Sequence, residues 1–334
     1  LLWEDRAVLM PFVSVVPNLF DVPEIRADYR YVMCDFEDDD FSAMLRRSGF
    51  HQILAKDTFI HHFGGVTLNE VRTKRGNYKS IVSMRPVFRE KWKVDPWESR
   101  GHLHFMDAFI KELSADAFPA RVLVIEPMFG EGLLAVRNYF HKMRQDVVID
   151  AVVTDVRYMA DTQYMADNII SLDTLDRLSE TLHEHYDLII VVAPLNNLPI
   201  DDMVAFFQSC YSFLRPQGLI HASLINYNSF KYTMESLPND LPYLIYDHIL
   251  PLEGCRIFPI RRLIAGLQEA FSDSHVRIVY AKGGCHFAGA DSFIQITEGI
   301  LGTGEEKRAL LYQLVMGDVL GICIHQGIAY NDPL

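Results

Sequence analysis

The sequence predicts an α/β protein built around a doubly wound, mostly parallel sheet. Between residues 121 and 225, apolar stretches of strand length alternate with stretches of helical period, which is the pattern of a doubly wound domain. The apolar stretches are continuous, as in strands that are buried on both faces of a parallel sheet. The chain has 334 residues. A single core stops growing at roughly 250–300 residues, so a second domain is expected.

The expected elements follow in order along the chain. Apolar residues recur with helical period from 103 to 113, which predicts an amphipathic helix there. The predicted strands are 121–126, 147–154, 186–192 and 219–225, and the remaining helices are 132–144, 173–184 and 201–213. The C-terminal segment, 291–334, is predicted to be an extension that holds a strand and an apolar helix at 308–324.

A polar linker divides the chain. Residues 96–102 contain Pro and Gly and follow a segment of helical pattern, which is typical of a domain boundary. The division places an N-terminal lobe at 1–95 and the doubly wound domain at 103–290.

Composition narrows the class of protein. The formal net charge of −13 disfavours nucleic-acid binding, and an anionic substrate would need a local cation, which favours a metal. Five dispersed cysteines without a CxxC pair predict reduced thiols in a cytoplasmic protein. No signal peptide is expected, and no apolar run has the length of a transmembrane segment. The apolar residues near the C-terminus belong to the core or to a homo-oligomer contact.

Four consecutive carboxylates, Glu37–Asp40, form the sharpest chemical feature of the N-terminal lobe. They precede a segment of helical period that ends at Gly49, so they are predicted to begin a helix. Asp39 or Asp40 would cap this helix and the other acids would complement its dipole. Because like charges repel at such spacing, a functional role in proton or cation binding is the alternative.

The N-terminal lobe resembles the C-terminal half of family-2 glycosyltransferases, which have a GT-A-like fold. The resemblance lies in four blocks in the family's order: Phe36-Glu37-Asp38-Asp39-Asp40-Phe41, Leu45–Phe50, Asp57-Thr58-Phe59-Ile60-His61-His62-Phe63-Gly64-Gly65 and Arg85–Trp92. A nucleotide-binding half with an Asp-x-Asp metal motif normally precedes these blocks. Residues 1–35 contain no such motif. The resemblance therefore implies the end of a longer protein, or a lobe that has lost its donor half.

The glycosyltransferase resemblance also implies roles for individual residues. Asp38 would be the general base that takes a proton from the acceptor hydroxyl during inverting transfer, with Glu37 beside it. Asp40, His61 and His62 would lie at a divalent metal, Mn²⁺ or Mg²⁺, which neutralises the diphosphate leaving group. The partners would be a nucleotide-sugar and a glycan acceptor. The alternative for the two histidines is a packed pair at the end of a strand.

The second domain resembles class I S-adenosylmethionine-dependent methyltransferases over residues 103–282. The first block is Val122-Leu123-Val124-Ile125-Glu126-Pro127-Met128-Phe129-Gly130-Glu131-Gly132, a strand that leads through a turn into a helix. This order of elements is the recipe for holding an adenosyl group. By the resemblance, Glu126, Gly130 and Gly132 would contact the cofactor and Asp155 would accept the ribose hydroxyls. The family has glycines where Glu126 and Met128 stand, which weakens the expectation that S-adenosylmethionine binds.

Three functional hypotheses follow from the sequence. The first is a bacterial glycosyltransferase part that carries a divergent methyltransferase-like domain and acts in glycan biosynthesis. The second is a methyltransferase that uses S-adenosylmethionine on a glycan or small metabolite, with residues 1–95 as an accessory lobe. The third is a scaffold in which both domains bind without catalysis.

Overall fold

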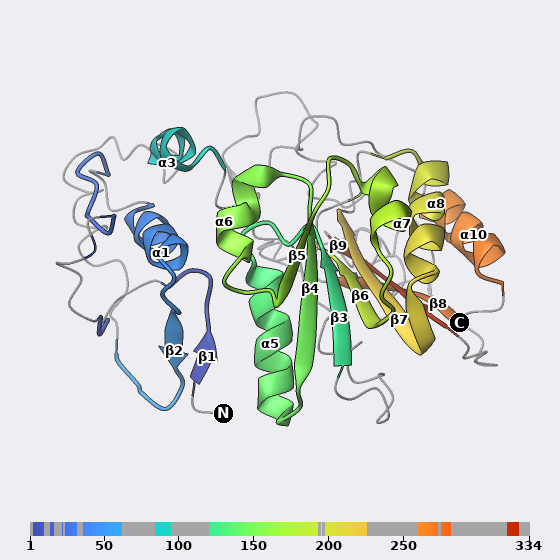
Figure 1. The fold of residues 1–334 in the computed structure, drawn as a ribbon, viewed down its shortest axis with the longest axis horizontal. Helices are drawn as coiled ribbons and strands as arrows, with labels where there is room; N and C mark the ends of the chain where they lie inside the picture. The colour runs from blue at the N-terminus through green and yellow to red at the C-terminus, as the bar shows by residue number, and fades with distance from the viewer. Residues whose placement is uncertain are drawn as a thin grey trace, which may run out of the picture.

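The computed structural model of the protein describes residues 3–9, 14–16, 22, 24–31, 36–61, 84–94, 120–192, 195, 198–225, 260–272, 275–281 and 319–326. A seven-stranded sheet dominates the described chain (Figure 1). Its strands are β3 (Ala120–Ile125), β4 (Val147–Val153), β5 (Asn168–Ser171), β6 (Tyr186–Val191), β7 (Leu214–Ile225), β8 (His275–Ala281) and β9 (Val319–His325). The helices around it are α5 (Glu131–Met143), α6 (Met159–Thr162), α7 (Leu178–Thr181), α8 (Ile200–Tyr211) and α10 (Ile260–Ala270).

The strand order is β5-β4-β3-β6-β7-β9-β8. The five strands from β5 to β7 are parallel, and β9 runs antiparallel to both β7 and β8. From β3 the chain moves outward to β4 and β5, and it then returns to the other side of β3 as β6. This reversal makes the carboxyl ends of β3 and β6 a topological switch point, where open α/β sheets bind their ligands. The predicted Rossmann-like α/β fold is therefore confirmed.

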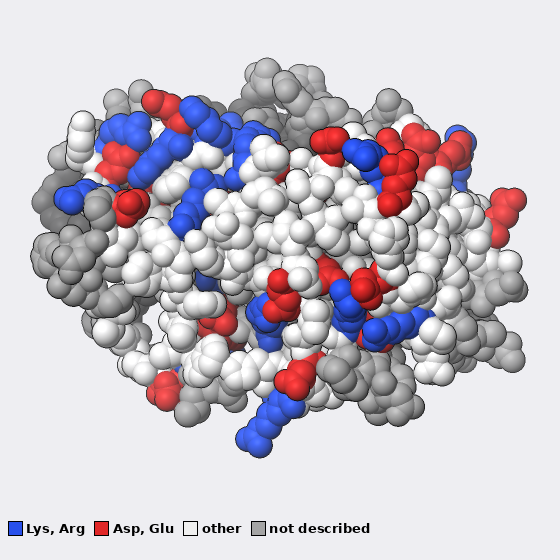
Figure 2. Space-filling model, viewed as in Figure 1, with Lys and Arg blue, Asp and Glu red and all other residues white. Residues whose placement is uncertain are grey.

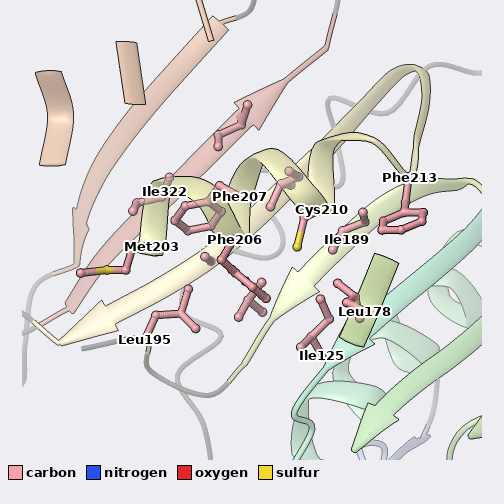
Figure 3. Packing of buried hydrophobic residues seen from close by; sticks show 14 of the residues in the cluster. Ile125, Leu178, Ile189, Leu195, Met203, Phe206, Phe207, Cys210, Phe213 and Ile322 are labelled. Carbon is pink, nitrogen blue, oxygen red and sulfur yellow. The ribbon is translucent and has the colours of Figure 1, made fainter. Parts of the chain in front are cut away.

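Each face of the sheet carries its own core. On one face, α5 packs its buried Leu133, Val136 and Phe140 against β3, β4 and β6. On the other face, α8 turns Met203, Phe206, Phe207 and Cys210 toward the sheet, as Figure 3 shows. Their spacing of three, four and seven residues is the period that makes a helix amphipathic.

The N-terminal lobe contains β1 (Trp3–Asp5), β2 (Ile53–Ala55), α1 (Glu37–Arg47) and α3 (Arg85–Trp92). β1 and β2 pair as a separate antiparallel ribbon. The lobe packs on the α/β domain beside α5 and α6 (Figure 1). The Asn138 side chain of α5 accepts from the Asp5 N–H at 2.9 Å and donates to the Asp5 carbonyl at 2.8 Å, as a neighbouring strand would.

Most of the expected elements are present, with small shifts of their ends. The strand prediction 121–126 corresponds to β3, 147–154 to β4, and 186–192 to β6. The helix predicted at 173–184 is shorter, since it consists of the 3₁₀ turn Leu175–Arg177 and α7. The predicted helix 103–113 and the linker 96–102 lie outside the described residues.

One prediction was wrong at the C-terminus. Residues 319–324 were expected to end an apolar helix, but they form β9, which lies between β7 and β8. Cys323 and its neighbours thus complete the main sheet and are not part of an appended extension. A continuous apolar run suits a buried strand as well as a buried helix, and its composition alone does not distinguish them. Within the described ranges, no helix combines the length and apolar character that a membrane crossing requires.

Candidate functional site

The turn from β3 into α5 lies at the switch point of the sheet. Ile125 ends β3 between Val152 of β4 and Val191 of β6, and α5 begins six residues later at Glu131. The turn residues Glu126, Met128 and Gly130 all have positive φ, at 53°, 51° and 80°. Left-handed backbone costs a residue with a Cβ about 1–2 kcal/mol. Glu126 and Met128 therefore adopt a backbone conformation that favours glycine, the residue type expected at both positions from the methyltransferase resemblance.

Glu126 directs its carboxylate toward the neighbouring strand end. Its Oε1 accepts hydrogen bonds from the backbone N–H of Thr154, at 3.0 Å, and from the Thr154 hydroxyl. Burial raises the pKa of Glu126, although the hydrogen bonds from Thr154 oppose this shift. The side chain thus ties the carboxyl ends of β3 and β4 together.

Asp155 follows β4 and lies next to this contact. Its carboxylate accepts from the backbone N–H of Arg157 at 3.0 Å and from Nε of the same residue at 2.9 Å. These hydrogen bonds lower the pKa of Asp155 and keep it ionised. In this state both carboxylate oxygens can accept hydrogen bonds from hydroxyl groups. The Asp155 side chain is 30% exposed. Asp155, the acid predicted to bind the ribose, therefore lies beside the turn, and Arg157 is its partner.

The two predicted glycines serve the start of α5. Gly130 is the N-cap residue, and a Cβ on it would lie 2.3 Å from Sδ of Met165. Gly132 is buried in the first turn of the helix. The N-terminus of this 13-residue helix faces the turn, and such an end attracts negative charge.

Three contributors to this site were not predicted from the sequence, namely Thr154, Arg157 and Phe129. Thr154 and Arg157 flank Asp155 in the sequence, so a strand-end acid followed by a cation was the available signal. Phe129 is 3% exposed and packs into a cluster of the N-terminal lobe with Phe36 and Phe88. No sequence pattern indicated that contact between the two parts of the chain.

The carboxylate run has an arrangement that differs from a metal site. The four acids form the first turn of α1, as expected, but the N-cap is Phe36 and no side chain caps the helix. Asp40 is 1% exposed, and it accepts from Lys91 Nζ at 2.8 Å, Trp92 Nε1 at 2.6 Å and Tyr31 Oη at 3.3 Å. Asp40 is therefore a buried anchor for α3. Both of its carboxylate oxygens already accept hydrogen bonds, which argues against its predicted role as a metal ligand.

The other residues of the glycosyltransferase prediction lie on α1, beyond β2 and outside the described residues. Asp38 and Glu37 are half-buried on the first turn of α1, and His61 is exposed beyond β2. His62 lies outside the described residues. In the described part of the chain, no three His, Cys, Asp or Glu side chains are grouped to hold a metal ion. The predicted divalent metal has no support in this lobe.

Basic side chains gather near the turn although the chain as a whole is acidic. Figure 2 shows Lys and Arg side chains over α3 and around the junction of α1 with α6. Arg157 Nη1 donates to the Lys93 carbonyl at 2.8 Å, and Arg47 Nη2 donates to the Arg157 carbonyl at 3.3 Å. These two hydrogen bonds join the lobe to Arg157, the partner of Asp155.

Comparisons with known proteins concern the fold. No protein-family model and no curated protein sequence matches the chain. A methyltransferase structure from Archaeoglobus fulgidus shares 15% identity at a TM-score of 0.42, with 72% of this chain and 98% of that chain covered. One from Clostridium acetobutylicum shares 10% at 0.41, with coverages of 80% and 99%. The plantazolicin methyltransferase BamL, solved with SAH, shares 13% at 0.41, with 78% and 95% covered.

All three of these proteins are methyltransferases, and two of them are named as dependent on S-adenosylmethionine. Because the TM-scores are low, the fold assignment for this chain rests on its own strand order. The comparisons give no support to a glycosyltransferase portion.

Proposed function

We propose that this chain carries a methyltransferase domain that binds S-adenosylmethionine at the carboxyl ends of β3 and β4. The observation that supports this best is the turn at the switch point, where Glu126, Met128 and Gly130 are all left-handed. A chain that tolerates this conformation at two residues with side chains retains a backbone suited to close approach by a ligand.

The groups around the turn 126–130 would suit an adenosyl group. Asp155 is ionised and partly exposed, so it would accept the ribose hydroxyls. The N-terminus of α5 would bind the carboxylate of the methionine part. The Glu126 side chain is directed to Thr154, and that of Phe129 is buried against the N-terminal lobe. The cofactor would supply a methyl group on a sulfonium, and the chain would align the acceptor with it.

A scaffold without catalysis is the second candidate. The observation that favours it is the pairing of Asp155 with Arg157, which occupies several of the lone pairs that a ribose would use. The two candidates differ in whether the ribose competes with Arg157 for this carboxylate. A glycosyltransferase activity is not proposed, because the comparisons give it no support and the described residues contain no group of three His, Cys, Asp or Glu that could hold its metal.

Thermal unfolding with S-adenosylhomocysteine tests the proposal. A ligand at 100 times its Kd stabilises a protein by about 2.7 kcal/mol, so the wild type should unfold at a higher temperature with the ligand present. Met128→Gly should enlarge this shift, because it removes the side chain from the position where the backbone would meet the ligand. Gln217→Gly is the matched control, since Gln217 also has positive φ (65°) but lies near the amino ends of β6 and β7, away from the turn. A melting temperature that the ligand leaves unchanged in all three proteins would favour the scaffold.

A further inference from the structure

Arg46 joins the N-terminal lobe to the α/β domain. It lies in the last turn of α1 and its side chain is 5% exposed. Its Nε and Nη2 donate to Oδ1 of Asp161 at 3.2 and 2.9 Å, and its Nη1 donates to the Ala7 carbonyl. Asp161, in α6, is fully buried, and its Oδ2 accepts from Arg47 Nη2 at 2.7 Å. Two guanidinium groups therefore share a single buried carboxylate.

The same arginine contacts the turn of the candidate site. The guanidinium carbon of Arg46 lies 5.1 Å from the ring centroid of Phe129. Two further rings contact Phe129 in a T-shaped geometry, Tyr158 at 5.7 Å and Phe88 at 6.3 Å between centroids. Phe129 is the residue between the two left-handed positions Met128 and Gly130. The ring thus fixes the middle of the turn from several sides.

The charge balance makes the ring contact important. Burial lowers the pKa of Arg46, and Asp161, which it shares with Arg47, together with Glu131 offsets this cost to its charged form only in part. The face of an aromatic ring attracts a cation, most strongly where water is excluded. Conversely, left-handed backbone at a residue with a side chain persists only where its surroundings hold it. Arg46 and the turn therefore depend on each other.

We propose that Arg46 is a positioning residue, which acts through Phe129 to hold the turn 126–130 in its left-handed conformation. The N-terminal lobe is then a structural part of the site and not an independent catalytic unit. Where the inference concerns a nucleoside, it rests on the function proposed above. A ligand on the turn and the docked lobe would strengthen each other by the same factor.

Hydrogen exchange of backbone amides tests this role without any ligand. The reporters are the Gly130 N–H, which donates to the Pro127 carbonyl at 2.8 Å, and the Leu134 N–H, which donates to the Gly130 carbonyl at 3.0 Å. Arg46→Lys keeps the charge but loses the planar fork and its stacking, and Phe129→Leu keeps an apolar side chain without the ring. Each should speed exchange at both reporters about tenfold, while the amides of β3 change little.

Arg121→Lys is the matched control. Arg121 also pairs with a buried carboxylate, Asp150 at 2.8 Å, and stacks on an aromatic ring, Tyr186 at 5.7 Å, but at the other end of β3. It should leave exchange at Gly130 unchanged. If Arg46→Lys and Phe129→Leu leave the reporters as slow as in the wild type, or if Arg121→Lys speeds them equally, the positioning role is overturned.

Affinity for S-adenosylhomocysteine provides the second measurement on the same variants. The two lobe variants should bind it about tenfold more weakly than the wild type, which corresponds to about 1.4 kcal/mol. Faster exchange with unchanged affinity would overturn the claim that the lobe completes the site. A wild type that binds no S-adenosylhomocysteine would refute the proposed function, while the exchange rates would still decide the role of Arg46.

Discussion

Replacing Gly130 with alanine tests how the turn is built. Gly130 has a φ of 80°, and an added Cβ would lie 2.3 Å from Sδ of Met165, which is 4% exposed. The left-handed backbone costs alanine about 1 kcal/mol, and displacing a buried side chain costs about 1–3 kcal/mol. Gly130→Ala should therefore lower the free energy of unfolding by about 2–4 kcal/mol.

Urea unfolding followed by circular dichroism measures this change. Gly266→Ala in α10 is the matched control, because its Cβ would meet only Val204 Cγ2 at 3.2 Å and alanine favours a helix by about 1 kcal/mol. Its free energy of unfolding should stay within about 1 kcal/mol of the wild type. The double variant Gly130→Ala/Met165→Ala should lose less stability than the sum of the losses of the two single variants, since the truncated Met165 side chain makes room for the added Cβ. A Gly130→Ala protein as stable as the wild type would refute the described geometry.

Burial and its acidic neighbours raise the pKa of Asp38 from 3.8 to about 6, so the folded state holds this proton more tightly than the unfolded state. The stability that the protonated Asp38 contributes is lost as pH rises through this interval. Asp38→Asn should therefore raise the melting temperature at pH 8 but not at pH 3. The control Asp176→Asn, at an exposed position, should raise it at neither pH. Tyr186→Phe should cost about 1 kcal/mol in urea unfolding, because its hydroxyl donates to Asp150 at 3.0 Å; no loss would exclude that bond. Mn²⁺ should leave the melting temperature unchanged, since both carboxylate oxygens of Asp40 already accept hydrogen bonds from Lys91 and Trp92. A rise with Mn²⁺ that Asp40→Asn abolishes would contradict this.

The strands of the parallel sheet could be predicted because burial on both faces demands continuous apolar runs. Ala120–Ile125 and Tyr186–Val191 are examples, with almost every side chain fully buried. The same reasoning missed β5, because Asn168–Ser171 has only four residues and two of them are exposed. It also mistook residues 319–324 for part of a helix, since an antiparallel strand inserted between two others is as apolar as a buried helix.

The candidate site could be predicted only in part, because its chemistry depends on contacts between distant residues. The turn and Asp155 were found from their places after two strands. The side chains of Glu126 and Met128, where the resembled family has glycines, weakened the expectation that S-adenosylmethionine binds, and the sequence did not show that the backbone at both residues is left-handed. Asp40 illustrates the opposite case: its acidic neighbours suggested a metal, but Lys91 and Trp92, some fifty residues away, make it an anchor.

The proposed function requires that an adenosyl group bind at the carboxyl ends of β3 and β4, beside Asp155. Calorimetric titration of the full chain with S-adenosylhomocysteine tests it most directly. Saturable binding of one ligand per chain is expected, and Asp155→Ala should weaken it by about tenfold or more, as for the loss of a charge-assisted hydrogen bond. Asp146→Ala, a change at an exposed acid that precedes β4 at the amino end of the strand, should leave the affinity unchanged. The absence of saturable heat from the wild type, or binding that Asp155→Ala leaves intact, would contradict the claim.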